Sequence, residues 1–172
     1  MADNALRLTT ERLVLIPFAP EFIEALADRH AAERLIDAII PGGWPDAELA
    51  GLLQVYGPSI AADPLGIGYG PWIIVAHDRR AVVGSAGFQG MPREHAIELG
   101  FGVHAHYRKQ GYASEAARAL VFWGLRQPDV ERIIAKCDLA NAASVRVLEK
   151  AGMSRVGEAE GTLLWELRRA QP

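Results

Sequence analysis

The sequence predicts a mixed α/β (α+β) domain, and three observations lead to this class. Short segments such as 11–18 and 96–103 alternate apolar and polar side chains, as strands do. Apolar residues in 22–39 recur at a spacing near 3.6, as helices require. The segments also follow a mixed order: strand, two helices, three strands, helix, strand, helix, two strands. We therefore expect one sheet with mixed strand directions.

The first half of the chain supplies an opening strand, two helices and a hairpin. Alternation predicts a strand at 11–18, which ends at the prolines that follow. Helical spacing over 22–39 predicts one long or broken helix before the stop in "PGGWP". A second, short helix covers 49–56. Residues 72–88 are typical of two strands joined by a turn at 77–80, so they form a hairpin.

The second half alternates strands with helices and closes on another hairpin. Residues 96–103 form a strand whose glycines leave room for a bulge or a close ligand. A helix at 114–126 and a buried strand at 131–138 follow. The next helix, 141–151, is followed by a glycine placed to end it in a left-handed conformation. The hairpin at 154–169 ends the domain.

Composition limits the organisation and the partners. Half of the 172 residues are hydrophobic, which suits one domain over 1–172 with its core at about 10–168. Eighteen Lys and Arg stand against 21 Asp and Glu, a net charge of −3. Such a chain has no global positive field to hold a polyanion, so nucleic acid is not expected as a partner.

Three further features favour a cytoplasmic protein. Cys137 is the single cysteine, which excludes an internal disulfide and removes the usual sign of an oxidising compartment. The amino terminus carries acidic Asp3 and lacks the basic and apolar regions of a signal peptide. No apolar run approaches the roughly 20 residues that cross a bilayer, so no membrane is expected as a partner.

The stretch "HYRKQGYA", residues 106–113, predicts an anion site. It joins a strand to a helix, so the unpaired N–H groups of the first helical turn converge with the loop amides. Gly111 permits close backbone approach, and Arg108 can add a charge-assisted bond to a phosphate. The stretch lacks both the Walker pattern and the GxGxxG pattern, which disfavours kinases and dehydrogenases. An ordinary strand-to-helix turn with solvated cations is the alternative for this stretch alone.

A second stretch, "LANAASVRVLEKAGM" at 139–153, follows the next strand. Together with "RKQGYA" and "TERLVLIPF", it resembles the GCN5-related N-acetyltransferase (GNAT) superfamily, and within it the branch of the ribosomal-protein alanine acetyltransferases. The resemblance runs from about Thr10 to Arg168. It implies a mostly antiparallel sheet of about seven strands flanked by about four helices. The sheet would splay between the strands at 96–103 and 131–138, the fourth and fifth of the seven.

The resemblance implies acetyl-CoA as co-substrate and assigns residues to it. The strand positions beside the pantetheine arm would be Phe101, Gly102 and Val103. The loop that holds the pyrophosphate would be Arg108, Lys109, Gln110, Gly111, Tyr112, Ala113 and Ser114, with Lys109 standing where relatives commonly carry glycine. Asn141 would reach the pantetheine or acetyl end from the second stretch.

The resemblance also implies direct attack of a neutral amine on the acetyl carbon, which requires a base and an acid. Glu98 stands at the strand position where relatives often place the base. Its alternative is a strand-surface glutamate paired with an arginine. Leu148 stands where relatives often carry a tyrosine acid, so Ser144, or a water that it holds, takes that role here. Ser144 can equally be a helix-surface hydroxyl bonded to the preceding turn.

Several interpretations stay open. Trp44 either lines the acceptor entrance or plugs the core. His104 and His106 are spaced like metal ligands, but no cysteine or carboxylate completes a site, so no metal is expected. The resemblance favours a protein or peptide amino terminus as acceptor, with a small amine and a homodimer left open. A CoA-binding regulatory domain and a nucleotide-binding protein are the alternatives to an enzyme.

Overall fold

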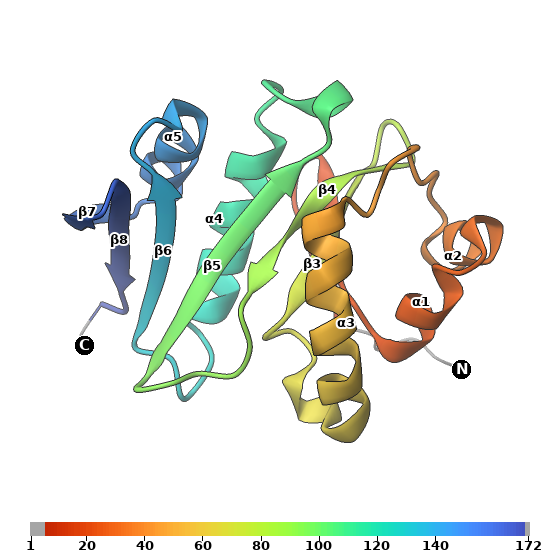
Figure 1. Cartoon of the computed structure of the whole chain (residues 1–172), viewed down its shortest axis with the longest axis horizontal. Coiled ribbons are helices and arrows are strands. Elements are labelled where there is room, and N and C mark those ends of the chain that lie inside the picture. Colours follow the sequence, from red (N-terminus) through yellow and green to blue (C-terminus); the bar gives the residue numbers. More distant parts are fainter. Residues whose placement is uncertain (1–5, 171–172) are drawn as a thin grey trace.

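The computed structural model describes residues 6–170 as one mixed sheet with helices on both faces (Figure 1). Asp3 lies outside the described residues. The order across the sheet is β1-β2-β3-β4-β5-β6-β8-β7, and only β5 and β6 are parallel neighbours. The predicted α/β class and the mostly antiparallel sheet are confirmed. The strands are β1 (Leu8–Thr9), β2 (Leu13–Pro17), β3 (Pro71–Ala76), β4 (Ala81–Phe88), β5 (Ala96–Val103), β6 (Arg132–Asp138), β7 (Ser154–Ala159) and β8 (Thr162–Arg168).

One strand more is present than the sequence predicts. β1 consists of two residues, Leu8 and Thr9, which pair antiparallel with Leu15 and Val14 of β2. Two residues are too few to show an alternating pattern, so this edge strand is visible only in its pairing.

The helices also differ in number and length from those predicted. The segment 22–39 divides into two helices because the Asp28 carboxylate accepts a hydrogen bond from the His30 N–H and starts a new helix there. The predicted short helix at 49–56 extends over 16 residues as α3. The α-helices are α1 (Pro20–Ala25), α2 (Arg29–Ile36), α3 (Ala47–Ala62), α4 (Tyr112–Gly124) and α5 (Ala142–Lys150), and the 3-10 turns are η1 (Pro64–Gly66) and η2 (Ala105–Tyr107).

Two cores lie on opposite faces of the sheet. Alternate residues of the central strands pack on α4 in one core, for example Ile74 against the face of α4 that carries Leu120. Their neighbours, such as Ile73, pack in a second core with Leu53 of α3. Figure 1 shows α4 behind the sheet, whereas α1, α2 and α3 cover the half formed by β2, β3 and β4. The front of β5, β6 and β8 carries no described helix (Figure 1).

No helix within residues 6–170 combines the length and apolar character that a bilayer crossing requires.

Candidate functional site

The sheet opens between β5 and β6. Ala96–Leu99 pairs with Arg132–Ala135, whereas the rest of β5 pairs only with β4. The last part of β6, Lys136–Asp138, pairs only with β8. The two strands therefore part at their carboxyl ends, where the resemblance implies the splay. Because β5 and β6 are parallel, these ends lie at one edge of the sheet.

The loop after β5 gathers unpaired amides at this edge. Helix α4 begins at Tyr112, and Gly111 is its N-cap residue with φ of 84°, in the left-handed region that glycine adopts without strain. Lys109 also has a positive φ, 60°. The six consecutive backbone N–H groups from Lys109 to Ser114 donate no hydrogen bond to another described residue. Helix N-termini with free N–H groups bind anions, so the predicted anion site has the required donors.

Two arginines that the sequence analysis did not assign to the site support this loop. Arg12 Nη1 donates to the carbonyl oxygen of Gln110 (2.9 Å), and its guanidinium lies 5.0 Å from the centroid of the Tyr112 ring. Arg79 Nη2 donates to Gln110 Oε1 (3.1 Å), and Arg79 Nε donates to the Tyr112 hydroxyl (3.2 Å). Tyr112 is buried, so its ring anchors the loop and only its backbone is available for a ligand.

Glu115, in the first turn of α4, holds Arg12 in place. Its Oε2 accepts from Arg12 Nε (2.7 Å), and its Oε1 accepts from the Arg12 N–H (2.9 Å) and the Thr10 hydroxyl (2.6 Å). Burial acts to raise the pKa of this carboxyl, but the hydrogen bonds from Thr10 and Arg12 outweigh it and lower the pKa below its ordinary value. A negative charge in the first helical turn also suits the helix dipole.

The cations of the loop take different positions. Arg108 is exposed, and its Nε donates to the carbonyl oxygen of Val103 (3.1 Å) at the end of β5. One of the five N–H donors of this guanidinium is thereby used, and the others remain for a ligand. Lys109 is exposed at the tip of the loop. Ser114 and Ala113 lie in the first turn of α4, with Ser114 buried.

Glu98 lies on β5 where its pairing with β6 is about to end. Lys136 Nζ donates to its Oε2 (2.9 Å) and Gln89 Nε2 to its Oε1 (3.3 Å). The partner is thus a lysine of the neighbouring parallel strand and not the arginine considered from the sequence. A carboxylate has about four lone-pair sites, so two contacts leave it able to accept a proton.

Helix α5 places the second predicted stretch at the same edge. Asn141 is its N-cap residue, and Asn141 Oδ1 accepts from the backbone N–H of Ser144 (3.0 Å). Asn141 is exposed and Ser144 is half-buried, and the Ser144 hydroxyl forms no hydrogen bond with another residue of 6–170. Leu148, one turn further along α5, is fully buried.

Trp44 lies in the interior of the protein. Its side chain is buried in the second core and stacks on Phe18 with ring centroids 5.9 Å apart. Of the two interpretations of Trp44, this burial supports the one in which the indole contributes to packing.

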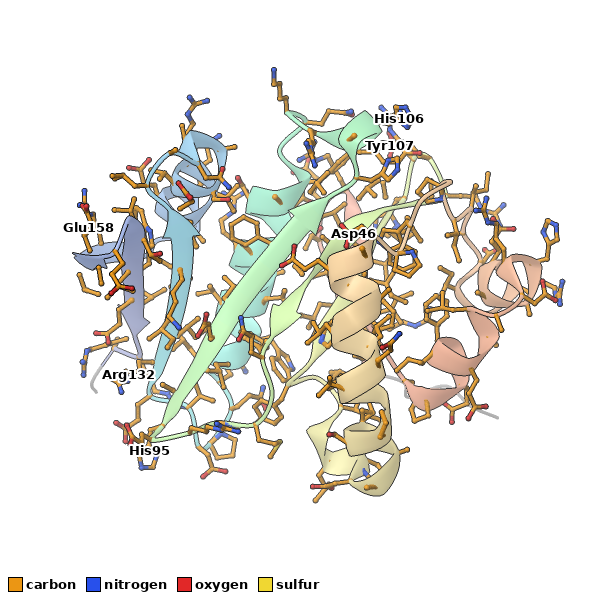
Figure 2. All side chains as sticks on the ribbon, viewed as in Figure 1. Asp46, His95, His106, Tyr107, Arg132 and Glu158 are labelled. Atoms are coloured by element: carbon orange, nitrogen blue, oxygen red, sulfur yellow. The ribbon has the colours of Figure 1, made fainter. Side chains whose placement is uncertain are left out.

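A cavity of about 150 Å³ lies instead between the start of α3 and the open part of β5. Its polar lining includes Asp46, Glu48 and Ser85, and Gly100 and Gly102 lie on its β5 side. Figure 2 shows Asp46 at the start of α3, on the side of the carboxyl-terminal half of β5, whereas His95 and Arg132 lie at the opposite ends of β5 and β6. The Asp46 carboxylate caps α3 by accepting from the Leu49 N–H (2.9 Å). The cavity therefore combines negative charge with the part of β5 that has lost its β6 partner.

The predicted residues thus fall into two groups in space. The strand end, the loop and the α5 cap gather at one edge of the sheet, where β5 and β6 part, and Glu98 lies further down β5. The described residues contain no cluster of three or more His, Cys, Asp or Glu placed to hold a metal ion. His104 directs one ring nitrogen to the carbonyl oxygen of Gly42 (3.1 Å).

Proteins of one family resemble this chain over most of its length. A family model described as the acetyltransferase (GNAT) domain matches residues 12–154. The uncharacterized N-acetyltransferase YjdG of Bacillus subtilis (strain 168) is 33% identical over 153 residues, which are 88% of each chain.

Solved structures share the fold. The ribosomal-protein-S5-alanine acetyltransferase of Vibrio fischeri superposes with a TM-score of 0.67 at 18% identity, over 95% of this chain and 97% of that one. RimL, a ribosomal L7/L12 alpha-N-protein acetyltransferase in complex with coenzyme A, gives a TM-score of 0.66 at 18% identity, over 95% and 98% of the two chains. At this level of identity the superpositions establish a common architecture.

Proposed function

The chain belongs to the GNAT acetyltransferase family, and from this premise we propose that it transfers the acetyl group of acetyl-CoA to a primary amine, with a protein or peptide amino terminus as the favoured acceptor. Family membership makes the protein an acyltransferase. We propose acetyl-CoA as the donor, an amino terminus as the acceptor, and the residue roles given below.

The free backbone amides of the loop support acetyl-CoA as the acetyl donor. Six successive N–H groups, from Lys109 to Ser114, open at the positive end of α4 and suit the charged pyrophosphate of CoA. Arg108 adds a guanidinium beside the end of β5, where Phe101, Gly102 and Val103 have no β6 partner. These residues suit CoA for two reasons. The loop offers hydrogen-bond donors to the pyrophosphate, and the parting of β5 from β6 would admit the pantetheine arm.

Glu98 is the proposed base. An alkylammonium has a pKa near 10, so the acceptor amine must lose a proton before its nitrogen can attack the acetyl carbon. The side chain of Glu98 is 18% exposed. Glu98 lies on β5 two residues before Gly100 and four before Gly102, and both glycines line the cavity. It would take the proton directly or through water as the new N–C bond forms and the C–S bond breaks.

Ser144, or water that it binds, is the proposed acid for the departing thiolate. Its backbone is fixed by the Asn141 cap, and its half-buried hydroxyl lies in the first turn of α5. Leu148 offers no proton, and its complete burial places it in the core. The exposed Asn141 amide would contact the pantetheine or acetyl end. Calorimetry with acetyl-CoA on Asn141→Asp, which keeps a capping oxygen, tests that contact, since unchanged affinity would remove it.

Two observations support an amino-terminal acceptor. Structural neighbours of the same fold are described as acetyltransferases of ribosomal proteins. The cavity beside β5 carries Asp46 and Glu48, whose negative charges suit an ammonium before it is deprotonated.

The decisive experiment is a thiol-release assay with acetyl-CoA across peptides and small amines. Release of CoA that depends on an amine, with the acetylated product identified by mass spectrometry, is the expected result. Binding of acetyl-CoA without any amine-dependent release would overturn the proposal and leave a CoA-binding protein.

A further inference from the structure

We propose that a groove along helix α3 binds the polypeptide that follows the acceptor amine, so that the enzyme acts on chains and not on free small amines. The inference rests on the N-acetyl transfer proposed above and specifies its acceptor class. We call this feature the α3 groove. Its helix side includes Leu52, Val55 and Ser59, and its opposite side is formed by residues 89–93 between β4 and β5.

The α3 groove continues from the cavity that lies beside β5. The two hollows share four lining residues, Leu52, Pro71, Phe88 and Gln89. The groove has a volume of about 550 Å³, within the range of about 300 to 1,000 Å³ that ligand sites usually occupy. An amine held against β5 therefore has a continuous path for the atoms attached to it.

One face of α3 forms the groove along its length. Glu48, Leu52, Val55 and Ser59 follow each other at steps of four, three and four, so they share one helix face. The neighbouring face, which carries Leu53, packs into the core. From Glu48 to Ser59 the helix rises about 16 Å, the length of about five residues of extended chain.

The middle of the groove is apolar on both sides. Leu52 is 40% exposed and Val55 is 73% exposed on the helix, and Met91 is 50% exposed across from them. Packing does not require these side chains, since the core side of α3 is complete without them. Apolar surface that the fold leaves exposed in a groove gains free energy when a partner covers it.

Charge fixes the direction of the occupant. Asp46 and Glu48 stand at the end beside β5, where an ammonium would enter, and Asp63 and Arg93 stand at the other end. Arg93 has no ion pair among residues 6–170. The occupant is therefore an extended amino-terminal segment of about five residues, with its amine at β5 and an apolar side chain in the middle of the groove.

The test compares kcat/KM for an alanine-initiated pentapeptide with an apolar third residue and for alaninamide. The wild type should prefer the pentapeptide by about tenfold or more. The double variant Val55→Glu/Met91→Glu should reduce this preference about tenfold, because two carboxylates replace apolar contacts. Both positions are exposed, so the variant is expected to fold, and its melting temperature verifies this.

A matched control adds the same two charges elsewhere. Leu65 and Phe122 are 81% and 65% exposed and line neither hollow, so Leu65→Glu/Phe122→Glu should keep the peptide preference of the wild type. Equal preference in the wild type and the groove variant, or an equal loss in the control, overturns the inference while N-acetyl transfer stands. A change in oligomeric state of the groove variant alone also overturns it, since the groove would then contact a second copy. If the wild type acetylates neither substrate, the proposed function itself fails.

Discussion

Glu115 binds Arg12 twice, through the side-chain Nε (2.7 Å) and the backbone N–H (2.9 Å), and so joins two segments 103 residues apart. Arg12 in turn donates to the carbonyl oxygen of Gln110. The chain before β2 is thereby fastened to the loop whose amides face outward. Neither Arg12 nor Glu115 needs to touch a ligand for the loop to depend on them, so both are positioning residues.

Replacing Glu115 with Gln should weaken acetyl-CoA binding. Gln keeps the shape and one acceptor oxygen but removes the charge that holds Arg12, so the loop amides lose their fixed geometry. We expect the dissociation constant measured by calorimetry to rise about tenfold, or about 1.4 kcal/mol. Glu160→Gln removes one exposed charge in the turn between β7 and β8 and is the matched control. If Glu115→Gln lowers the melting temperature but leaves the affinity for acetyl-CoA unchanged, the contact between Glu115 and Arg12 stabilises the fold without positioning the loop for its ligand.

The same carboxyl should make stability depend on pH. The pKa of Glu115 is lowered in the folded protein, because hydrogen bonds from Thr10 and Arg12 outweigh the effect of burial. A lowered folded pKa stabilises the fold above the unfolded value, and this stabilisation is lost as pH falls through the folded pKa. The difference in free energy of unfolding between wild type and Glu115→Gln should therefore shrink as pH falls below about 4.5. Urea unfolding at pH 6 and pH 3.5 measures it, and a difference that does not shrink contradicts the assignment.

Arg108→Ala should weaken acetyl-CoA binding about tenfold or more while the protein stays folded. The exposed guanidinium makes one contact, to the carbonyl of Val103, and its other donors are available to a phosphate. Arg118→Ala, which removes an exposed cation further along α4, is the control for charge alone. Equal affinities of wild type and Arg108→Ala by calorimetry would remove this residue from the pyrophosphate site.

Ser144→Ala should lower kcat and leave the affinity for acetyl-CoA near that of wild type. The cap of α5 survives, because Asn141 accepts from the backbone N–H of Ser144 and not from its hydroxyl. General-acid groups contribute about 100-fold or more, and a water that Ser144 positions would give a smaller loss. Ser144→Thr, which restores a hydroxyl, should recover most of the rate. If kcat is unchanged in Ser144→Ala, the thiolate takes its proton from elsewhere.

The fold was predictable where the signal is local. The strand at 96–103 is found with the predicted bounds, since its alternation is a property of neighbouring residues. The helix predicted at 141–151 is found as α5 (Ala142–Lys150), one residue shorter at each end, with Asn141 as its N-cap residue and Gly152 after it with φ of 84°. Apolar spacing left open whether the segment 22–39 is one helix or a broken one, because the position of the break depends on the hydrogen bond from the His30 N–H to the Asp28 carboxylate.

Only the features of the site that depend on residues close together in the sequence were predictable. The loop amides follow from a glycine before a helix, which the sequence shows directly. Arg79 reaches Gln110 from 31 residues away, and Arg12 from 98, so no spacing rule pairs them. The "TERL" stretch contains Arg12, but charge alone does not name its partner. The two interpretations of Trp44 could not be separated from the sequence for the same reason, because only the packing against Phe18 shows that the side chain is interior.

Glu98→Gln separates an enzyme from a protein that only binds CoA. Gln keeps the shape and a hydrogen-bonding oxygen but removes the base, so acetyl-CoA affinity should survive while turnover falls by about 100- to 10,000-fold. The loss should shrink as pH rises, since more of the acceptor amine is then already neutral.

Glu166, which lies in a similar environment on the same sheet, supplies the control for Glu98. Glu98 pairs across the sheet with Ile134, which in turn pairs with Glu166 of β8, so the three residues form one row. The Glu166 side chain is 16% exposed, against 18% for Glu98, and it also forms ion pairs, with Arg132 and Arg168. Glu166→Gln thus removes a half-buried, paired charge from the same sheet without removing the proposed base. Equal rates for the two variants would assign Glu98 to the ion pair with Lys136, whereas a loss confined to Glu98→Gln, greatest at neutral pH, assigns it the proton transfer.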